Sequence, residues 1–306
     1  MAKRERRKKL IKTIPHKGLQ ERLLAWIDPD IAIVPVLRLG GVISASASPL
    51  RDGLNLAGIA GDLEAAFTQP GAKAVALVIN SPGGSPVQSS LIFKRIRALA
   101  NEHELPVYAF VEDAAASGGY MIACAADEIY ADEHSVIGSI GVVSSGFGFT
   151  GLIEKLGVER RVHTSGESKS MLDPFKPENP ADVERLKALQ AEVHKGFKDL
   201  VKASRGARLK EETPGLFSGE FWVATQALPF GLIDGIGDIR GVLREKFGEK
   251  TKLRLVGGPR PWWRRRASIA SEMSGLQGMS SPFGRDFAGD LLASLETRSF
   301  WSRFGL

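Results

Sequence analysis

Short apolar runs alternate with stretches of helical periodicity along the middle of the chain, and this alternation restricts the fold more than any other feature. The run Ala74–Ile79 is wholly apolar, which is typical of a short strand buried on both faces of a sheet. It is followed by the turn residues 80–84 and then by apolar side chains at helical spacing as far as Leu99. Strands and helices in this order predict an α/β fold with a mostly parallel sheet.

The helix that follows residues 80–84 has a clear start. Ser85 can cap it, Pro86 suits its first position, and Gln88 can complete a capping box with Ser85. Further strands are expected at 107–111, 129–131, 137–143 and 158–164, a short helix over 150–156 before Gly157, and a turn into a tightly packed helix within 114–126.

The longest helix is expected over 181–204. Its apolar side chains recur on one face, among them Leu189, Val193, Phe197 and Val201, and Gly206 closes it. An apolar face of this length predicts that the helix packs against other parts of the molecule.

Two turns at the carboxyl ends of expected strands have an unusual composition. Residues 80–84 read Asn-Ser-Pro-Gly-Gly and residues 115–120 read Ala-Ala-Ser-Gly-Gly-Tyr. Functional groups collect in such strand-to-helix turns of parallel α/β folds. Small neighbours would let a substrate backbone approach Ser117, and the N–H groups of the next helix can stabilise a developing oxyanion. Ser117 is therefore a candidate nucleophile; the alternative is that it only caps the helix.

A nucleophilic serine needs a base, and no histidine is marked for that role. None of the five histidines lies in a motif, and no pair has the spacing of metal ligands: His16, His103, His134, His163 and His194. A neutral lysine can also deprotonate a serine. Lys169 lies among small residues just after the expected strand 158–164, although by composition alone it is typical of a solvated loop.

Several stretches, taken in order, resemble the SppA-type signal peptide peptidases, which are serine peptidases with a Ser/Lys dyad. The resemblance covers roughly residues 32–256, and the matching stretches are 78–84, 116–120, 137–142, 166–175, and a closing segment over 217–219 and 231–237. Each motif alone is weak. The ordered set, with Ser117 and Lys169 52 positions apart, is specific.

The resemblance implies a role for each matching residue. Ser117 would be the nucleophile and Lys169 its general base and later its general acid. Gly84 and Gly118 would supply the N–H groups of an oxyanion hole. Ser139 would hold the lysine amine toward Ser117.

The lysine role places a demand on its surroundings. An ordinary lysine pKa is near roughly 10.4, so a lysine base needs a dry site in which no carboxylate pairs with the amine. Glu167 and Asp173 are the nearby carboxylates in sequence, and both are expected to point away. The chain departs from the family at Ser168, where an aromatic residue is frequent, and at Glu220 and Ala224, where an arginine and a glycine are frequent.

The resemblance also implies a Clp/crotonase-like α/β fold of repeated β-β-α units in a homo-oligomer that needs no cofactor or metal. Its substrates would be short or unfolded peptides, with remnants of signal peptides as a plausible source. Two alternatives stay open: a related enzyme of the Clp or hydratase type, and a catalytically silent crotonase-like scaffold that binds peptides at a membrane surface. A Clp-type protease would need a marked histidine after the serine, and a hydratase would need glutamates near it.

The net charge of +6 is confined to the ends of the chain. Residues 1–12 carry seven basic and one acidic side chain, residues 257–306 carry seven and four, and residues 13–256 carry 27 and 30. This distribution predicts three parts: a basic amphipathic segment 1–30, a peptidase domain 31–256, and a basic tail 257–306 that contains Trp262 and Trp263. A nucleic-acid-binding body is disfavoured because it has no basic stripe.

The same charges motivate a hypothesis about location. The basic residues 3–12 precede apolar side chains on one face of a possible helix, so this segment can hold the protein at an anionic membrane surface; a solvated tail is the alternative. No apolar run approaches the roughly 20 residues of a spanning helix, and no signal peptide is recognised. The expected location is cytoplasmic, with contact to the inner face of the plasma membrane. The single cysteine, Cys124, excludes a disulfide framework and receives no catalytic role.

Overall fold

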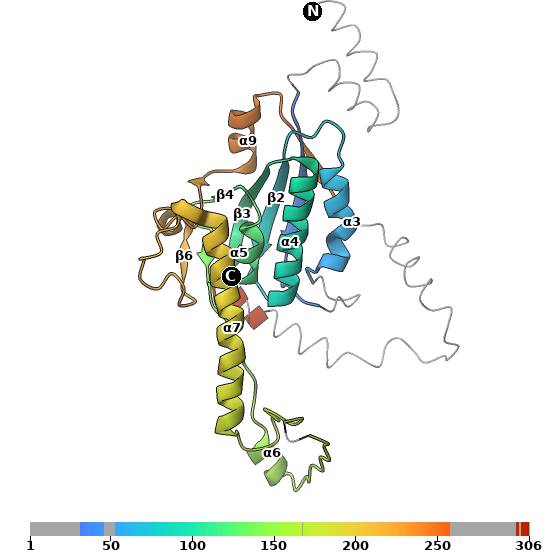
Figure 1. Ribbon diagram of the computed structural model, residues 1–306, viewed down its shortest axis with the longest axis vertical. Helices are drawn as coiled ribbons and strands as arrows, with labels where there is room; N and C mark the ends of the chain where they lie inside the picture. Colours follow the sequence, from blue (N-terminus) through green and yellow to red (C-terminus); the bar gives the residue numbers. More distant parts are fainter. Residues whose placement is uncertain (1–30, 46–52, 167, 258–297, 300, 306) are drawn as a thin grey trace, which may run out of the picture.

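The computed structural model describes residues 31–45, 53–166, 168–257, 298–299 and 301–305 (Figure 1). The basic segment 1–30 and most of the tail 257–306 lie outside the described residues, and so do His16, Glu167, Trp262 and Trp263.

A single mostly parallel sheet forms the centre of the body. Its main path runs β6-β5-β3-β2-β1-β8, and β4 lies beside β3 and carries β7. Every pairing of these strands is parallel except that of β5 with β6. The strands are β1 Ile33–Gly40, β2 Val75–Ser81, β3 Val107–Ala116, β4 Glu128–Ala131, β5 Val136–Gly138, β6 Phe221–Val223, β7 Gly235–Ile236 and β8 Lys252–Val256. The predicted α/β class is confirmed.

Strand β3 is shared by two neighbours on the same side. Its first half, Tyr108–Val111, pairs with β4, and its second half, Ala114–Ala116, pairs with β5. The Asn80 side chain holds the junction, because its Nδ2 donates to Asp113 Oδ2 at 2.5 Å and its Oδ1 accepts from the Ala114 N–H. The strand therefore continues to Ala116, beyond the end predicted at Val111, and delivers the chain directly to Ser117.

Helices cover both faces of the sheet. On one face lie α3 Leu56–Phe67, α4 Pro86–His103 and α5 Gly118–Ala123 (Figure 1). On the other face Leu243 of α9, Ile239–Phe247, packs with Val36, Val78 and Phe110. The remaining helical elements are α6 Thr150–Lys155, α7 Pro180–Arg205, η1 Gly206–Arg208 and α8 Ala224–Ala227.

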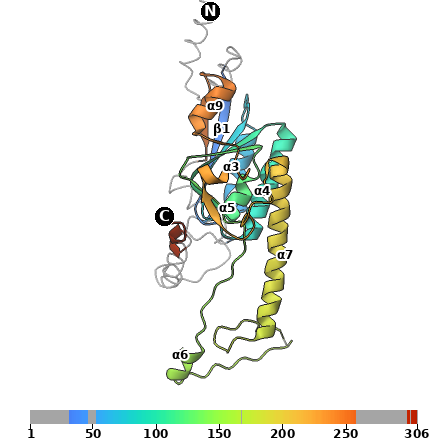
Figure 2. The same ribbon diagram turned by 90° about the vertical axis from the view of Figure 1, so that its left-hand side faces the viewer.

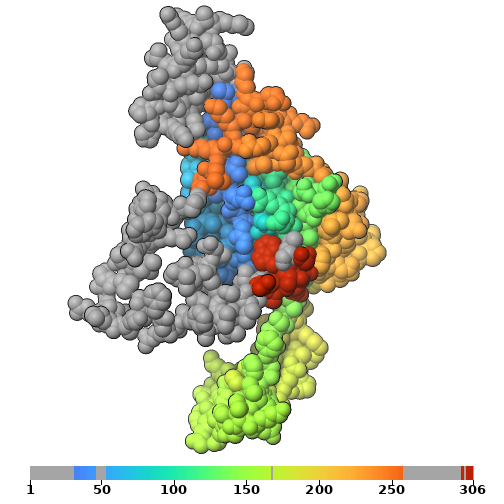
Figure 3. Space-filling view, turned by 180° about the vertical axis from the view of Figure 1, so that it is seen from behind, coloured from blue at the N-terminus to red at the C-terminus, as the bar shows by residue number. Residues whose placement is uncertain are grey.

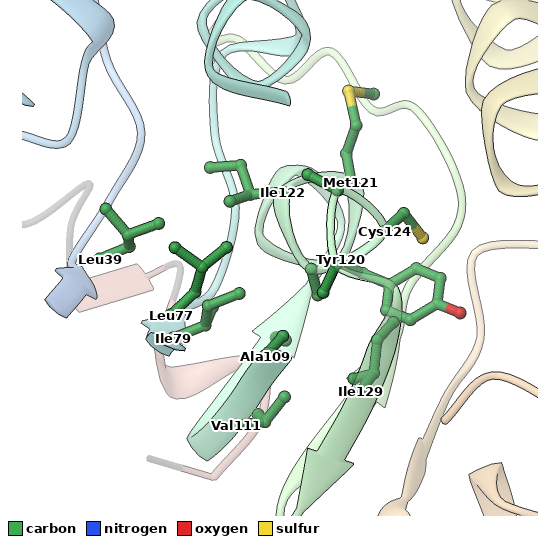
Figure 4. Packing of buried hydrophobic residues seen from close by; sticks show 14 of the residues in the cluster. Leu39, Leu77, Ile79, Ala109, Val111, Tyr120, Met121, Ile122, Cys124 and Ile129 are labelled. Atoms are coloured by element: carbon green, nitrogen blue, oxygen red, sulfur yellow. The ribbon is translucent and has the colours of Figure 1, made fainter. Parts of the chain in front are cut away.

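Small side chains let α5 lie close to the sheet. All six of its residues are buried, and Figure 4 shows Tyr120, Ile122 and Cys124 above the side chains of β3 and β4. The Tyr120 hydroxyl donates to the Leu232 carbonyl at 2.7 Å, so the ring spans the core and satisfies its polar end. This packing confirms the tight helix predicted within 114–126 and fixes the start of α5 beside the sheet.

The start of α4 differs in part from the prediction. Ser85 caps the helix through its Oγ, which accepts from the Gln88 N–H, and Pro86 is its first residue. The Gln88 side chain, however, accepts from the Leu56 N–H at the start of α3, while the Ser85 N–H donates to the Ile43 carbonyl. The capping box is therefore only half formed, because Gln88 satisfies an orphan donor of a neighbouring helix instead of its own.

Residues 143–192, called the arm below, project from the body (Figure 2). The arm holds the extended chain after β5, helix α6 and the N-terminal half of α7. The strand expected at 158–164 is absent, since these residues have no sheet edge to join. The strand expected at 137–143 is limited to β5, because Ser139, with a φ of 52°, turns the chain out of the strand.

Helix α7 packs on the body through its C-terminal half alone. Phe197 and Val201 are buried as predicted, but Leu189 and Val193 are 56% and 41% exposed. The helix ends at Gly206, as expected. The predicted apolar face exists, but Leu189 and Val193 on it are left exposed by the described part of the chain.

A buried ion pair anchors α7 to the body. Arg205 is 1% exposed and binds both carboxylate oxygens of Asp234, at 2.8 and 2.9 Å. Asp234 also accepts from the Ile129 N–H of β4, and Arg208 adds a third cationic contact. The C-terminal end of α7 is therefore tied to β4 by charge-assisted hydrogen bonds.

Candidate active site

Ser117 lies between the end of β3 and the start of α5 in an uncommon backbone conformation. Its φ of 52° and ψ of −120° are rarely adopted by residues with a side chain. Its N–H donates to the Gly138 carbonyl at 2.8 Å, which fixes the turn against β5. Although Ser117 occupies the cap position of α5, its side chain makes no capping hydrogen bond. The alternative that Ser117 serves as a helix cap is therefore not supported.

The turn 80–84 lies directly against Ser117. Ser81 Oγ donates to the Gly41 carbonyl and accepts from the Gly83 N–H, which shapes the turn. A Cβ on Gly83 would lie 2.8 Å from the Ser117 Cβ and 2.9 Å from the Gly118 nitrogen, and the φ of Gly83 is 102°. Only glycine fits this position, because both the space and the backbone conformation exclude a side chain.

Two backbone N–H groups are available beside Ser117. The bridge between Ile43 and Gly84 uses the Gly83 carbonyl and the Ser85 N–H, and leaves the N–H of Gly84 out of the pairing. Gly118 is the first residue of α5, so its N–H has no acceptor within the helix. Donors of this kind are the chemical requirement for stabilising an oxyanion.

Ser117 opens into a pocket of about 280 Å³. Ser139 and Gly84 line the same pocket, so three of the residues singled out in the sequence share one cavity. The full lining is Pro82, Gly84, Pro86, Ser117, Ser139, Gly141, Val142, Val143, Ser218, Gly219, Arg303 and Phe304.

Ser139 is held at the wall of this pocket by strands β5 and β6. Its N–H donates to the Glu220 carbonyl at 2.7 Å, and its φ of 52° turns the chain away from β5. The preceding residue, Gly138, has a φ of 109° and faces the Trp222 ring, which a Cβ would approach to 3.0 Å. Two consecutive residues with positive φ thus direct the Ser139 segment along the pocket.

No base lines this pocket among the described residues. Its lining contains no histidine, lysine or carboxylate, and Arg303 is its one charged residue. The ring nitrogen Nε2 of His194 lies 3.1 Å from the Ile140 carbonyl oxygen, outside the pocket, and the His103 ring stacks on Phe67. His134 and His163 are exposed, and no group of three or more potential metal ligands occurs in the described part of the chain.

Lys169 lies in the arm. Its side chain is exposed, its N–H donates to the Gly166 carbonyl, and it forms none of the ion pairs between described residues. Asp173 pairs with Arg160 at 2.7 Å, and no ion pair joins it to Lys169 among the described residues. Within one chain, four of the predicted site residues therefore lie together at the pocket: Ser117, Gly84, Gly118 and Ser139. Lys169 lies in the arm and does not line this pocket.

Several lining residues were not singled out as site residues from the sequence. Ser218 and Gly219 belong to the closing segment 217–219, which carried a family signal but no assigned role. Arg303 and Phe304 come from the last residues of the chain, where no motif marked them. Burial raises the pKa of the Cys124 thiol to about 12, consistent with a packing residue that takes no part in catalysis.

The sequence profile described as peptidase family S49 matches residues 100–252. A putative protease of Synechocystis sp. is 31% identical over 212 residues, which are 67% of this chain and 74% of that protein. A putative signal peptide peptidase SppA of Enterococcus faecium is 35% identical over 167 residues, which are 54% of this chain and 47% of that protein.

A protein of Brucella abortus (strain 2308) named Na(+)/H(+) antiporter NhaA is 50% identical over 279 residues, 89% of this chain. The chain spans only 37% of that protein, whose name describes the whole. A solved structure of a 1510-N membrane-bound stomatin-specific protease aligns with 74% of this chain at 16% identity and a TM-score of 0.44. Among the described residues of this chain, no helix is both long and apolar enough to cross a bilayer.

Proposed function

The chain belongs to peptidase family S49, and from this premise we propose that it is a serine endopeptidase in which Ser117 is the nucleophile and Lys169 of a second copy is the general base. The observation that carries the proposal is the Ser117 turn. A serine with a strained backbone and no capping hydrogen bond opens into a pocket that two glycine N–H groups adjoin.

The reaction follows from this arrangement. Ser117 Oγ attacks the carbonyl carbon of a peptide bond and passes its proton to the neutral Lys169 amine, while the N–H groups of Gly84 and Gly118 stabilise the oxyanion. The lysine then protonates the leaving amine, and the acyl group remains on Ser117. A water molecule, deprotonated by the lysine, attacks the ester and releases the carboxyl product.

Two observations support a second copy as the source of Lys169. The pocket lining within one chain holds no base among the described residues. Lys169 is exposed on an arm that projects from the body (Figure 2). The arm also exposes apolar side chains that an assembled oligomer would bury, and Val193 directly follows it: Phe147, Leu152, Leu156 and Leu189.

Peptides in an extended conformation are the proposed substrates. The pocket is lined mainly by glycine, serine, proline and valine, which leave room for a peptide backbone beside Ser117. Folded proteins present few such segments, so unfolded peptides, including remnants of signal peptides, are the class that this site favours.

Mixing two inactive variants tests the proposal. Ser117→Ala and Lys169→Ala should each abolish cleavage of an unstructured fluorogenic peptide. When the two variants are unfolded and refolded together, about a quarter of the sites combine an intact Ser117 with an intact Lys169 of a neighbour, and activity should return.

The matched control is Lys176→Ala, which removes another exposed lysine of the arm and should leave activity unchanged. A mixture that stays inactive would contradict a dyad formed between copies. Purified protein that binds peptides but cleaves none would favour the scaffold instead of the peptidase.

A further inference from the structure

A histidine that no sequence motif marks lies behind the wall of the catalytic pocket. The Nε2 atom of His194, on α7, is 3.1 Å from the Ile140 carbonyl oxygen. A carbonyl oxygen only accepts hydrogen bonds, so Nε2 carries the proton and donates it. Ile140 lies between Ser139 and Gly141 in the chain, and both of these neighbours line the pocket of Ser117. The imidazole therefore holds the pocket wall from outside the pocket.

The wall segment, residues 139–143, joins no strand of the sheet after β5. Its Ile140 side chain is buried in the core, and Gly141 packs closely on Gly219. A Cβ on Gly141 would lie 2.9 Å from the Gly219 Cα. Because the segment has no ladder of backbone hydrogen bonds, its position depends on a small number of contacts, and the bond from His194 is one of them.

His194 also lies at a boundary on α7. Val193 before it is 41% exposed, whereas Phe197 after it is buried against the body. The chain after β5 and the N-terminal half of α7 both project from the same side of the body, as the space-filling view shows (Figure 3). The hydrogen bond from His194 to Ile140 joins these two segments near the body. The placement of α7 is thereby coupled to that of the wall, because a hydrogen bond restricts both distance and direction.

We propose that His194 is a positioning residue of the catalytic pocket, which holds the wall 139–143 where a peptide binds beside Ser117. It acts through the Ile140 carbonyl and touches neither the substrate nor the reacting atoms. Ile140 is 0% exposed, so loss of the donor leaves a buried carbonyl oxygen unpaired, and the wall shifts until water reaches that oxygen. Peptide binding weakens, whereas the Ser117 turn keeps its own bond to the Gly138 carbonyl. The inference rests on the proposed function for the site that the wall serves, but its effect on binding needs no catalysis.

A binding experiment on a catalytically dead protein tests the wall alone. The full chain with Ser117→Ala is titrated with a fluorescein-labelled form of the unstructured peptide used for hydrolysis, and binding is followed by anisotropy. His194→Phe keeps a ring but has no donor, so in this background Kd should rise about fivefold. His134→Phe is the matched control. It removes an imidazole that is 85% exposed, so the Ser117→Ala/His134→Phe protein should bind like Ser117→Ala alone.

Two amide variants test the geometry of the bond. The side-chain nitrogen of glutamine reaches about as far from the backbone as histidine Nε2, whereas that of asparagine stops one carbon short. In the Ser117→Ala background, His194→Gln should therefore restore Kd to within about twofold, and His194→Asn should bind as weakly as His194→Phe. A residue that only fills space on α7 would make the two amides equivalent, and that result would overturn the inference.

A second variant displaces the wall from its other contact. Gly141→Ala adds a Cβ that meets Gly219, so it should also weaken binding, by about fivefold. If both changes act on the position of one segment, the loss in Gly141→Ala/His194→Phe should be smaller than the product of the separate losses; losses that multiply would contradict the inference. Circular dichroism and thermal unfolding identify any variant that fails to fold, and His194→Leu replaces His194→Phe if that protein is among them.

Kinetics of the active protein separate this inference from the proposed function. His194→Phe should raise KM for the peptide about fivefold and leave kcat within about twofold. A lowered kcat with unchanged KM, or an unchanged Kd in folded His194→Phe, would overturn the inference while the peptidase stands. If no peptide is cleaved but the Ser117→Ala series binds as described, the peptidase fails and the positioning role stands.

Discussion

At the scale of single residues, the site depends on backbone conformations that few side chains tolerate. Ser117 and Ser139 both have a φ of 52°, and the two glycines before Ser85 have φ values of 102° and 140°. Each such serine costs about 1–3 kcal/mol and is retained only where the surroundings hold it in place, whereas glycine adopts a positive φ without this cost. Here the surroundings are β3, β5 and the Ile43 bridge, so the strain is concentrated around one hydroxyl.

The Gly83 position gives a direct test of this packing. Gly83→Ala should reduce peptidase activity by more than about tenfold and lower the free energy of unfolding by about 1–3 kcal/mol, since the new Cβ would meet the Ser117 turn. The measurements are peptide hydrolysis and urea denaturation.

Gly61→Ala in α3 is the control. No atom lies within 4 Å of a Cβ built there, so helix propensity should make it neutral or stabilising by up to about 1 kcal/mol. A fully active Gly83→Ala protein would contradict the tight contact between the two turns.

The sequence predicts the parts of the site that lie in local motifs at strand ends, but not the contacts that segments remote in the sequence make there. The motifs around Gly84, Ser117 and Ser139 each lie at a strand end, and parallel strands bring such ends to one edge, so their meeting in one pocket was predictable. Phe304 lies near the C-terminus, and no periodicity or motif in the sequence predicts its contact with Phe221. The place of Lys169 relative to Ser117 depends on the course of the arm, which local patterns do not encode.

At the scale of elements, apolar periodicity predicted where helices form better than what they contact. Strands β2, β3, β4 and β5 and helices α4, α5 and α7 were expected, because buried strands and capped helices leave local signals. Strands β1, β6, β7 and β8 were not predicted. The apolar face of α7 was also predicted correctly, but Leu189 and Val193 on this face are exposed in the single chain. The apolar residues near 158–164 suggested a strand, yet a strand needs an edge to pair with, and the arm offers none.

The anchor of α7 should be costly to break. Arg205→Ala leaves the Asp234 carboxylate buried without its main partner, so the free energy of unfolding should fall by about 3–5 kcal/mol in urea denaturation. Lys187→Ala removes a lysine from an ion pair in which both side chains are more than half exposed, and should have no measurable effect. Equal stability of the two variants would show that the anchor contributes nothing.

Asp234 also makes stability depend on pH. Burial raises the pKa of this carboxyl, but hydrogen bonds from Arg205 and the Ile129 N–H outweigh burial, and the pKa lies below its ordinary value. A carboxyl with a lowered pKa in the folded state stabilises the protein above its unfolded pKa, and this contribution is lost as pH falls through the folded pKa. Between about pH 6 and pH 3 the wild type should therefore lose stability more steeply than Asp234→Asn. Parallel curves from urea titrations at each pH would contradict this role.

At the scale of the whole molecule, the exposed arm predicts assembly. Leu189→Asp and Val193→Asp place charges on the uncovered face of α7, so each should reduce the mass measured by light scattering and, with it, peptidase activity. Neither residue is buried in one chain, so circular dichroism should show an intact fold. Lys187→Asp, on an exposed position of the same helix, is the control; unchanged mass in the Leu189 and Val193 variants would rule out this face as the interface.

The charge of the basic N-terminus leads to a separate prediction about location. Each basic residue near an anionic surface contributes about 1 kcal/mol, so a chain that lacks residues 1–12 should float less with anionic liposomes than the full chain. Neutral liposomes provide the control for charge. Equal flotation of both proteins on anionic liposomes would leave the solvated tail as the explanation.

The pairing of β1 with β8 has a consequence for biosynthesis. Ile33–Leu37 lie beside Lys252–Val256, so the strand that leaves the ribosome first among the described elements receives its second neighbour last. Until then the nascent chain carries an apolar strand with one unpaired row of N–H and C=O groups, which other chains can join. A polysome that synthesises this protein therefore carries several nascent chains with unpaired sheet edges close to one another. The yield of folded protein should depend on how well these edges are shielded until residue 256 has emerged.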